Sequence, residues 1–421
     1  MISTGNKKDK KVIASLDLGS DKIVCLIGHI NSIDRIVIKG IGHQKSQGIM
    51  NGTITDFKKA AQSIISAVSA AEKMAGYNID KIVVNISGRQ IFSNNISAEI
   101  DIAGKEIKEK EIFNLAKNVQ STFKSKNKEV IHLIPLEYSI DGVNGIHNPH
   151  SMIGDKLSVN FHVVTTLQSN IKNIENCIKK IPLTINNFVS SSYTSALTCL
   201  TKNENELGSI LIDIGGSNTA FSIFHANKFI YANNVPIGGI HITKDIASII
   251  GTDFHTAEAI KTMNTDFTLT SQEEIDLISM NTDEENTLGI VKIRKLDLND
   301  ITKSRLREML QMISTLIEKK NFEKIINNVV ITGGTGLIPG IDTFAEEIFK
   351  KPVRVGYPEH ISSVNIELSK RLQNPIYSSS IGILYFLKKM SEKTKLDDFK
   401  SHKKGWFNKL FGSIFRFIIN D

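Results

Sequence analysis

Two copies of one local pattern, in different halves of the chain, constrain the fold more than any other feature. Each copy has an apolar strand, an aspartate, a glycine-containing turn and a second apolar strand. The first copy surrounds Asp17 and the second surrounds Asp213. Glycines let backbone N–H groups approach an anion, and the aspartate can hold a hydrated cation. The repeat therefore predicts a duplicated fold with a nucleotide between its halves.

The composition is that of a globular chain and excludes several classes of protein. The 421 residues are 41% hydrophobic and 23% charged, which is enough for two or more cored domains. The net charge of +7 is scattered, without a Lys/Arg-rich run, so we expect no nucleic-acid partner. The three cysteines lack metal-ligand spacing. We find no signal peptide and no apolar run of the roughly 18 residues that a spanning helix needs.

Hydrophobic periodicity predicts alternating strands and helices along most of the chain. A typical helix is the one expected over 57–75, which should stop at Gly76. The other expected helices cover 108–123, 170–180, 188–200, 240–250, 254–263, 301–319, 341–349 and 378–390. The expected strands cover 12–16, 23–30, 35–44, 81–87, 90–97, 99–102, 130–140, 158–164, 228–237, 287–294, 327–332 and 353–355.

Residues 88–164 differ from the flanking sequence in their pattern of expected strands and helices, and we interpret them as a compact α+β insertion. Its loop over 141–155 contains His147 and His150. A metal site would require a third and fourth ligand at helical or hairpin spacing, and none is evident. We therefore interpret both histidines as loop residues.

A third glycine-rich turn, at 333–340, follows a predicted strand and precedes a predicted helix. A dinucleotide-binding fold begins in the same way, but it requires an acid at the end of the next strand. Here that strand is Val353-Arg354-Val355, followed by Gly356 and no acid. An adenosine-facing turn in a two-domain nucleotide cleft accounts for all three turns together.

These motifs resemble those of the actin/Hsp70/sugar-kinase ATPase superfamily and, within it, the FtsA family of bacterial cell division proteins. The phosphate-1 motif matches at 17–22, the phosphate-2 motif at 213–216 and the adenosine motif at 332–336. Further matches to the FtsA family cover Pro236 to Lys261, the strand at 352–356 and the helix start at 380–385.

The resemblance covers nearly the whole chain and implies an α/β, actin-like (ribonuclease-H-like, duplicated) two-domain ATPase fold. It also implies an FtsA-type inserted subdomain and a C-terminal amphipathic helix. In the first half of the fold we expect subdomain 1A over 1–87, 165–206 and 371–390, with subdomain 1C inserted at 88–164. In the second half we expect subdomain 2A over 207–240 and 329–370 and subdomain 2B over 241–328. A flexible tether is expected over 391–402 and a membrane-targeting helix over 403–421.

The resemblance also implies the ligands, ATP and Mg²⁺, and their binding residues. Asp17 and Asp213 would hold Mg²⁺ through water. The residues implied in ATP binding are Asp17, Gly19, Ser20, Asp21, Lys22, Asp213, Gly215, Gly216, Ser217, Asn218, Gly238, Glu258, Lys261, Gly333, Gly334, Thr335 and Gly336. Glu258 and Lys261 could instead form an ordinary exposed helix pair.

Two departures from the family pattern predict slow hydrolysis or none. The phosphate-2 run continues Ser217-Asn218-Thr219-Ala220, so the acid that often ends it is absent. Residues 189–194 offer only hydroxyls where active ATPases carry a Glu or Gln that orients water. We expect at most a weak ATPase and assign no catalytic residue.

The last nineteen residues form the second strong signal. Apolar and aromatic residues fall on one face of a helical wheel, with basic residues opposite, which is typical of a helix lying in a membrane interface. The residues expected to bind the membrane are Trp406, Phe407, Lys409, Leu410, Phe411, Ile414, Phe415, Arg416, Phe417 and Ile418. A helix that docks on the protein's own core is the alternative.

The function implied by the resemblance is an ATP-binding, actin-like cell division protein that forms polymers on the inner membrane. It would anchor the FtsZ ring through 241–328 and recruit later division proteins through 88–164, at the cytoplasmic face of the membrane and at the septum. The rivals are a pilus-assembly actin-like ATPase and a sugar or acetate kinase. A kinase would need a substrate pocket with an aspartate base, and no such insertion stands out.

Overall fold

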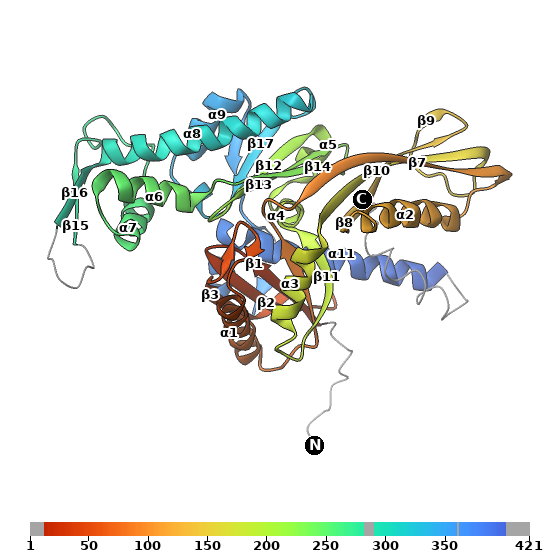
Figure 1. Ribbon diagram of the computed structural model, residues 1–421, viewed down its shortest axis with the longest axis horizontal. Helices are drawn as coiled ribbons and strands as arrows, with labels where there is room; N and C mark the ends of the chain where they lie inside the picture. Colours follow the sequence, from red (N-terminus) through yellow and green to blue (C-terminus); the bar gives the residue numbers. More distant parts are fainter. Residues whose placement is uncertain (1–11, 282–289, 360–361, 401–421) are drawn as a thin grey trace, which may run out of the picture.

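The computed structural model describes residues 12–281, 290–359 and 362–400, with side chains described up to residue 392. The chain folds into two lobes, each built on a mixed β-sheet, with an α/β insertion that projects from them (Figure 1). Residues 403–421, for which we expect a membrane-targeting helix, lie outside the described part.

The sheet of lobe one combines strands from residues 12–190 with one short strand, β19, from residues 362–363. Its strand order is β11-β6-β1-β2-β3-β19. The strands are β1 (Val12–Leu18), β2 (Lys22–Ile30), β3 (Ile36–Lys45), β6 (Lys81–Ile86), β11 (Thr184–Ser190) and β19 (Ser362–Ser363), with a separate hairpin of β4 (Ile49–Met50) and β5 (Thr53–Ile54).

The sheet of lobe two repeats this arrangement, with the order β14-β13-β12-β17-β18. Its strands are β12 (Ser209–Ile214), β13 (Thr219–His225), β14 (Lys228–Val235), β17 (Asn328–Thr332) and β18 (Val353–Val355). In both lobes the first strand pairs antiparallel with the second and parallel with a later one, β6 or β17. The duplication predicted from the two aspartate turns is therefore present in the fold.

Helix α1 (Phe57–Ala75) illustrates how the sequence sets local structure. Asp56 caps its N-terminus by accepting a hydrogen bond from the Lys59 N–H, and Gly76 ends it at φ 80°. Its buried face includes Ile64 and Val68, and its small residues let the backbone of β3 approach closely. The helix has the bounds predicted for it. The other helices of lobe one are α3 (Gln168–Ile178), α4 (Ser191–Cys199), α5 (Lys202–Leu207), α10 (Ile366–Leu372) and α11 (Ser378–Lys400).

The insertion is a four-stranded antiparallel sheet covered by one helix. The order is β7-β10-β8-β9, and the elements are β7 (Phe92–Glu106), α2 (Glu109–Lys124), β8 (Lys128–Ile140), β9 (Val143–Ile146) and β10 (Ile153–Leu167). Two strands predicted over 90–102 are one continuous strand, because β7 pairs with β10 along most of its length. The predicted loop at 141–155 contains β9, which forms a hairpin with β8.

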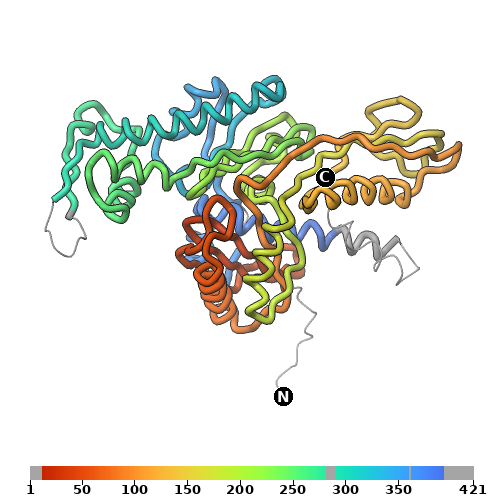
Figure 2. Tube along the Cα trace, in the orientation of Figure 1, coloured from red at the N-terminus to blue at the C-terminus, as the bar shows by residue number. Residues whose placement is uncertain are grey.

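The distal part of lobe two lies on the side opposite the insertion, as the chain trace shows (Figure 2). It contains α6 (Gly239–Ile250), α7 (Phe254–Asn264), β15 (Leu277–Asn281), β16 (Ile290–Arg294) and α8 (Lys295–Lys319), and α9 (Ile341–Phe349) follows. Buried residues of α8, such as Leu306 and Ile313, share one core with the strands of lobe two.

Three predictions about helices were wrong. Residues 184–190 form the parallel strand β11 beside β6, so the helix expected from 188 begins at Ser191. Helix α8 begins at Lys295, six residues before the expected start at Ile301. Helix α11 continues to Lys400 through the segment expected to be a flexible tether, since charged residues such as Lys and Glu favour helix as readily as solvated coil.

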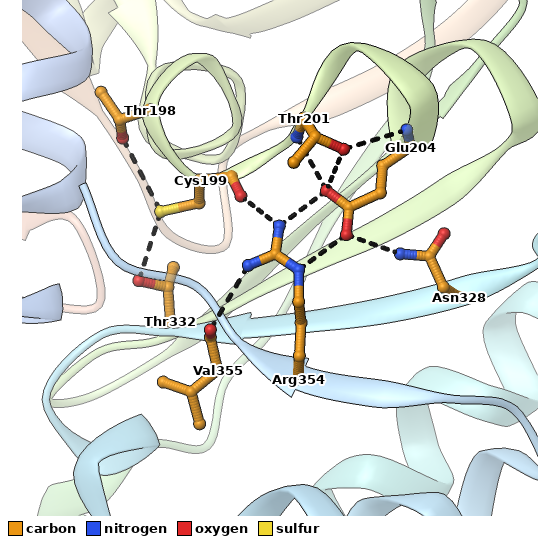
Figure 3. Close-up of polar contacts among 8 residues, drawn as sticks. All are labelled: Thr198, Cys199, Thr201, Glu204, Asn328, Thr332, Arg354 and Val355. Atoms are coloured by element: carbon orange, nitrogen blue, oxygen red, sulfur yellow. Dashed lines mark hydrogen bonds and ion pairs between the residues drawn. The ribbon is translucent and has the colours of Figure 1, made fainter. Parts of the chain in front are cut away.

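The chain passes from lobe one to lobe two between α4 and β12. Hydrogen bonds from Arg354 of β18 stabilise this connection (Figure 3). Its guanidinium donates hydrogen bonds of 2.7 and 2.6 Å to the two carboxylate oxygens of Glu204 on α5. It also donates to the Cys199 carbonyl at 2.6 Å. The C-terminal end of α4 is thus tied to the edge strand of lobe two.

No helix in the described ranges is both long and apolar enough to span a membrane.

Candidate functional site

The two aspartates that define the sequence repeat lie in one cleft between the lobes. Asp17 lies near the end of β1 and Asp213 near the end of β12, the corresponding strands of the two sheets. The cleft is lined by Asp17, Gly19, Ser20, Asp21, Lys22, Asn85, Ser87, Ser191, Asp213, Gly215, Gly216, Asn218, Ala220, Gly333, Gly334, Pro375, Ile376 and Ser379. The glycine-rich turns of both lobes therefore meet around one space.

Asp17 is held by side chains from two other elements. Asn85 of β6 donates from Nδ2 to Asp17 Oδ1 at 2.5 Å and to Ser379 Oγ at 3.0 Å. The Asn85 Oδ1 accepts the Leu18 N–H at 2.7 Å, so this buried amide is fully engaged. Ser380 of α11 donates to Asp17 Oδ2 at 3.3 Å. The orientation of the carboxylate is set by β6 and α11 together.

Asp213 has a hydroxyl partner from the crossing helix α4. Ser195 Oγ donates to Asp213 Oδ2 at 2.6 Å. Burial raises the pKa of Asp17 to about 6 and also raises the pKa of Asp213, because desolvation penalises the charged carboxylates. The positive charge of Lys22 opposes both shifts. Two enclosed carboxylates near one lysine form a site that an additional cation would stabilise.

The turns after the two aspartates are closed by their own backbone. The Gly19 N–H donates to the Lys22 carbonyl at 3.0 Å, and the Gly215 N–H donates to the Asn218 carbonyl at 3.1 Å. A Cβ at Gly216 would lie 2.9 Å from the Asp21 Cβ, so the turns of the two lobes are in contact. Small residues are required here because the two backbones approach each other.

Glu258 and Lys261, on α7, contact α6 and are not among the residues that line the cleft. Lys261 Nζ donates to Glu258 Oε2 at 2.6 Å, to Thr243 Oγ1 at 2.8 Å and to the Gly239 carbonyl at 3.2 Å. Thr243 also donates to Glu258. Glu258 and Lys261 are therefore part of a polar cluster between two helices, with the lysine side chain only 10% exposed, and not an isolated surface pair.

Several predicted residues stand behind the cleft surface. Gly238 is packed against the phosphate-2 turn, where a Cβ would meet the Gly215 carbonyl at 2.5 Å. Gly333, with φ +89°, lies against Asp213, since a Cβ there would be 2.6 Å from Oδ1. Gly336 faces Ile331 at the end of β17, and Thr335 approaches Gly239. These residues shape the site without reaching its surface, except for Gly333, which also lines it.

The sequence prediction missed several polar residues that line the cleft or lie next to it. These are Asn51, Asn85, Ser191, Ser195, Ser379 and Ser380. A signal existed for Asn85, because an amide in the middle of the apolar run Ile82 to Ile86 must find a buried partner. The serines gave no comparable signal, since hydroxyls are common at helix starts.

The donor set suits a hydrated Mg²⁺ that also binds phosphates. Mg²⁺ keeps several waters and is usually bound through one or two carboxylates plus substrate phosphates. Asp17 and Asp213 supply two carboxylates, and among the described residues no cluster of three or more His, Cys, Asp or Glu could hold a metal alone. The residues present therefore fit a metal that arrives with a nucleotide.

Solved structures with a similar fold define the class of protein. The chain matches the PilM–PilN type IV pilus biogenesis complex at a TM-score of 0.64 and 14% identity, over 88% of this chain and 96% of the other. It matches MreB5 of Spiroplasma citri at a TM-score of 0.55 and 14% identity, over 92% and 99%. The fold is that of an actin-like protein with two duplicated lobes.

Sequence comparisons then identify the family. The family model for cell division protein FtsA matches residues 210–382, that for the SHS2 domain inserted in FtsA matches 88–165, and that for type IV pilus assembly protein PilM matches 138–276. The chain is 32% identical to cell division protein FtsA of Rhizobium meliloti, over 90% of this chain and 88% of the relative. It is 31% identical to that of Borreliella burgdorferi, over 95% and 99%. The chain belongs to the FtsA family of cell division proteins.

Proposed function

We propose that the cleft between the lobes binds ATP with Mg²⁺ and that the bound nucleotide holds the two lobes together. The single observation that supports this most is the convergence of Asp17 and Asp213, each followed by a glycine turn, on one cleft. Lys22 lines the same cleft and supplies a positive charge for phosphate. The similar MreB5 structure of Spiroplasma citri was solved with AMPPNP, which agrees with this proposal.

The phosphates would be held mainly by the turns at 19–22 and 215–218, and the adenosine by the polar cluster that contains Glu258 and Lys261. Gly333 and Gly334, from the motif that the family resemblance assigns to adenosine, line the cleft. Mg²⁺ would neutralise negative charge on the phosphates, while Asp17 and Asp213 hold its water ligands. The raised pKa of both aspartates agrees with a site built to receive a cation.

Hydrolysis should be slow. Ser191 lines the cleft in the stretch where active ATPases carry a Glu or Gln that orients the attacking water, and Ala220 lines it where the family often has an acid that could position the cation. The third cleft aspartate, Asp21, is engaged with Lys45, whose Nζ lies 2.6 Å from its Oδ1. A purified protein that turns over ATP faster than about one per second would contradict this part of the proposal.

At the level of the cell, we propose a division protein that polymerises at the inner face of the cytoplasmic membrane. It would anchor the FtsZ ring through the α6–α8 part of lobe two and recruit later division proteins through the insertion. The membrane contact would come from 403–421, where bulky apolar residues such as Phe411 and Ile414 lie opposite Lys409 and Arg416 on a helical wheel.

Two experiments test these proposals separately. Calorimetric titration with Mg–ATP should show binding to the wild type and a loss of at least tenfold in affinity for Asp213→Asn, which keeps the Ser195 partner in place. Co-sedimentation with anionic vesicles should compare the full chain, a chain ending at Met390 and the full chain with Phe411→Glu. Equal vesicle binding by all three would rule out the C-terminal anchor and weaken the division proposal.

A further inference from the structure

One buried hydroxyl connects the lobes at the phosphate end of the cleft. Ser217 lies in the turn between β12 and β13 of lobe two and is 1% exposed. Its Oγ donates to Ser20 Oγ at 2.6 Å and accepts the Asn51 N–H at 2.9 Å. Ser20 lies in the β1–β2 turn and Asn51 in the β4–β5 hairpin, so both partners belong to lobe one.

These hydrogen bonds run in one direction. The backbone N–H of Asn51 can only donate, so Ser217 accepts from it, and Ser217 uses its own hydroxyl hydrogen to donate to Ser20. Ser20 is then left with a hydroxyl proton for which the described part of the protein provides no acceptor. Because Ser20 lines the cleft, this proton is available to a ligand oxygen.

The hairpin that contains Asn51 is firmly attached to lobe one. A Cβ at Gly52, where φ is +71°, would lie 1.9 Å from the Ser87 carbonyl, and a Cβ at Gly88 would lie 1.9 Å from the Asn51 carbonyl. These two backbones are in van der Waals contact, and Ser87 itself lines the cleft. Because the hairpin is fixed to lobe one, the hydrogen bond from the Asn51 N–H to Ser217 fixes the position of the β12–β13 turn of lobe two relative to lobe one.

We infer that Ser217 is a positioning residue that couples closure of the lobes to the presence of an anionic oxygen at Ser20, such as the terminal phosphate of a nucleoside triphosphate. This inference rests on the proposed nucleotide binding. An anionic acceptor on Ser20 strengthens each hydrogen bond behind it, because charge-assisted bonds polarise the chain of donors. A nucleoside diphosphate, which lacks that phosphate, leaves the chain unassisted. The lobes then close more tightly on the triphosphate.

The chain offers a matched control in Ser222 of β13. Its Oγ is also buried and also connects the lobes, by donating to the Ser192 carbonyl at 3.0 Å. Unlike Ser217, it does not contact a residue of the phosphate turns. A purely structural loss of one inter-lobe hydrogen bond should therefore affect Ser217→Ala and Ser222→Ala alike.

The test measures the dissociation constants of a non-hydrolysable ATP analogue and of ADP, both with Mg²⁺, for full-length wild type, S217A, S222A, S20A and the S20A/S217A double variant. We expect S217A to lose about three- to tenfold of the preference for the analogue over ADP, the effect of one hydrogen bond. S222A should keep the wild-type ratio. The double variant should lose little more than either single variant, since both act through one chain of bonds.

The outcomes separate the inference from the proposed function. Suppose that the wild type binds both the analogue and ADP. If S217A then weakens the two affinities by the same factor, or changes their ratio no more than S222A does, the inference is overturned and nucleotide binding still stands. Additive losses in the double variant also overturn it. Wild type that binds neither nucleotide overturns both the inference and the proposed function.

Discussion

Arg354 and Glu204 join the edge strand of lobe two to the segment through which the chain enters that lobe. The guanidinium contacts both carboxylate oxygens, and Glu204 also accepts hydrogen bonds from Asn328 and from the Thr201 backbone (Figure 3). Burial alone would raise the pKa of Glu204, but the hydrogen bonds from Arg354 and Thr201 outweigh it, and the net pKa is lowered. The carboxylate is therefore charged at neutral pH and fastens the inter-lobe crossing.

Removing Arg354 should destabilise the protein more than removing an exposed ion pair. Arg354→Ala leaves the Glu204 side chain, which is 15% exposed, without its charged partner, and we expect a loss of about 1–3 kcal/mol in the free energy of unfolding. The control is Arg294→Ala, which breaks the exposed pair with Asp297 and should cost less than about 1 kcal/mol. Urea denaturation measures both, and equal losses would contradict a special role for Arg354.

Acid should destabilise the junction between the insertion and lobe two. Burial lowers the pKa of His162 to about 4, and its ring nitrogens contact the Phe229 carbonyl and Ser93 Oγ at 2.8 and 2.7 Å. The unfolded chain takes up a proton near pH 6.5, but the folded chain does not until about pH 4. The contribution of this group to stability is thus complete above pH 6.5 and falls as the pH is lowered towards 4, by about 3 kcal/mol.

The matched variants for this effect are His162→Gln and His147→Gln. The first removes the group that titrates, so the decline between pH 6.5 and 4 should become shallower. The second replaces an exposed loop histidine and should leave the decline unchanged. Denaturation midpoints at half-unit pH steps give the comparison. Parallel curves for wild type and His162→Gln would show that other groups cause the loss.

The Asp17→Asn variant should be more stable than the wild type in the absence of nucleotide. Burial raises the pKa of Asp17 to about 6, so its contribution to stability is present below pH 4 and is lost as the pH rises through 6. At pH 7 the uncharged amide avoids this cost, and we expect a gain of about 1–3 kcal/mol. The gain should shrink at pH 5, while Mg–ATP binding should be lost. Asp101→Asn, at an exposed position of β7, should change neither property.

The crossing of α11 over α4 should tolerate no side chain at Gly382. A Cβ there would lie 1.8 Å from the Thr194 carbonyl oxygen, so the helices would have to separate. Alanine favours helix over glycine by about 1 kcal/mol, but the overlap should outweigh this and give a net loss of about 1–3 kcal/mol. At Gly334 an added Cβ meets nothing closer than 3.7 Å. Thermal unfolding of Gly382→Ala that matches Gly334→Ala would disprove the close contact.

Local sequence determined the elements and the main acids of the site. The two aspartate turns, helix α1 with its Asp56 cap and Gly76 stop, and strand β18 follow from patterns that span a few residues, because capping, turns and periodicity are short-range effects. The fold class and the family follow from the same motifs. Patterns failed where tertiary partners decide the structure. The helix expected from residue 188 begins at Ser191, because residues 184–190 pair with β6 as strand β11.

Only the tertiary structure decided how the site is held. Asn85, Ser195 and Ser217 gain their roles from contacts with residues far away in the sequence, at Asp17, Asp213 and Ser20. A buried hydroxyl or amide has no preference of its own for one acceptor, so its partner is set by whichever groups the packed lobes bring within hydrogen-bond distance. The sequence therefore determined which acids face the cleft, and the packing of the two lobes decided which neutral groups position them.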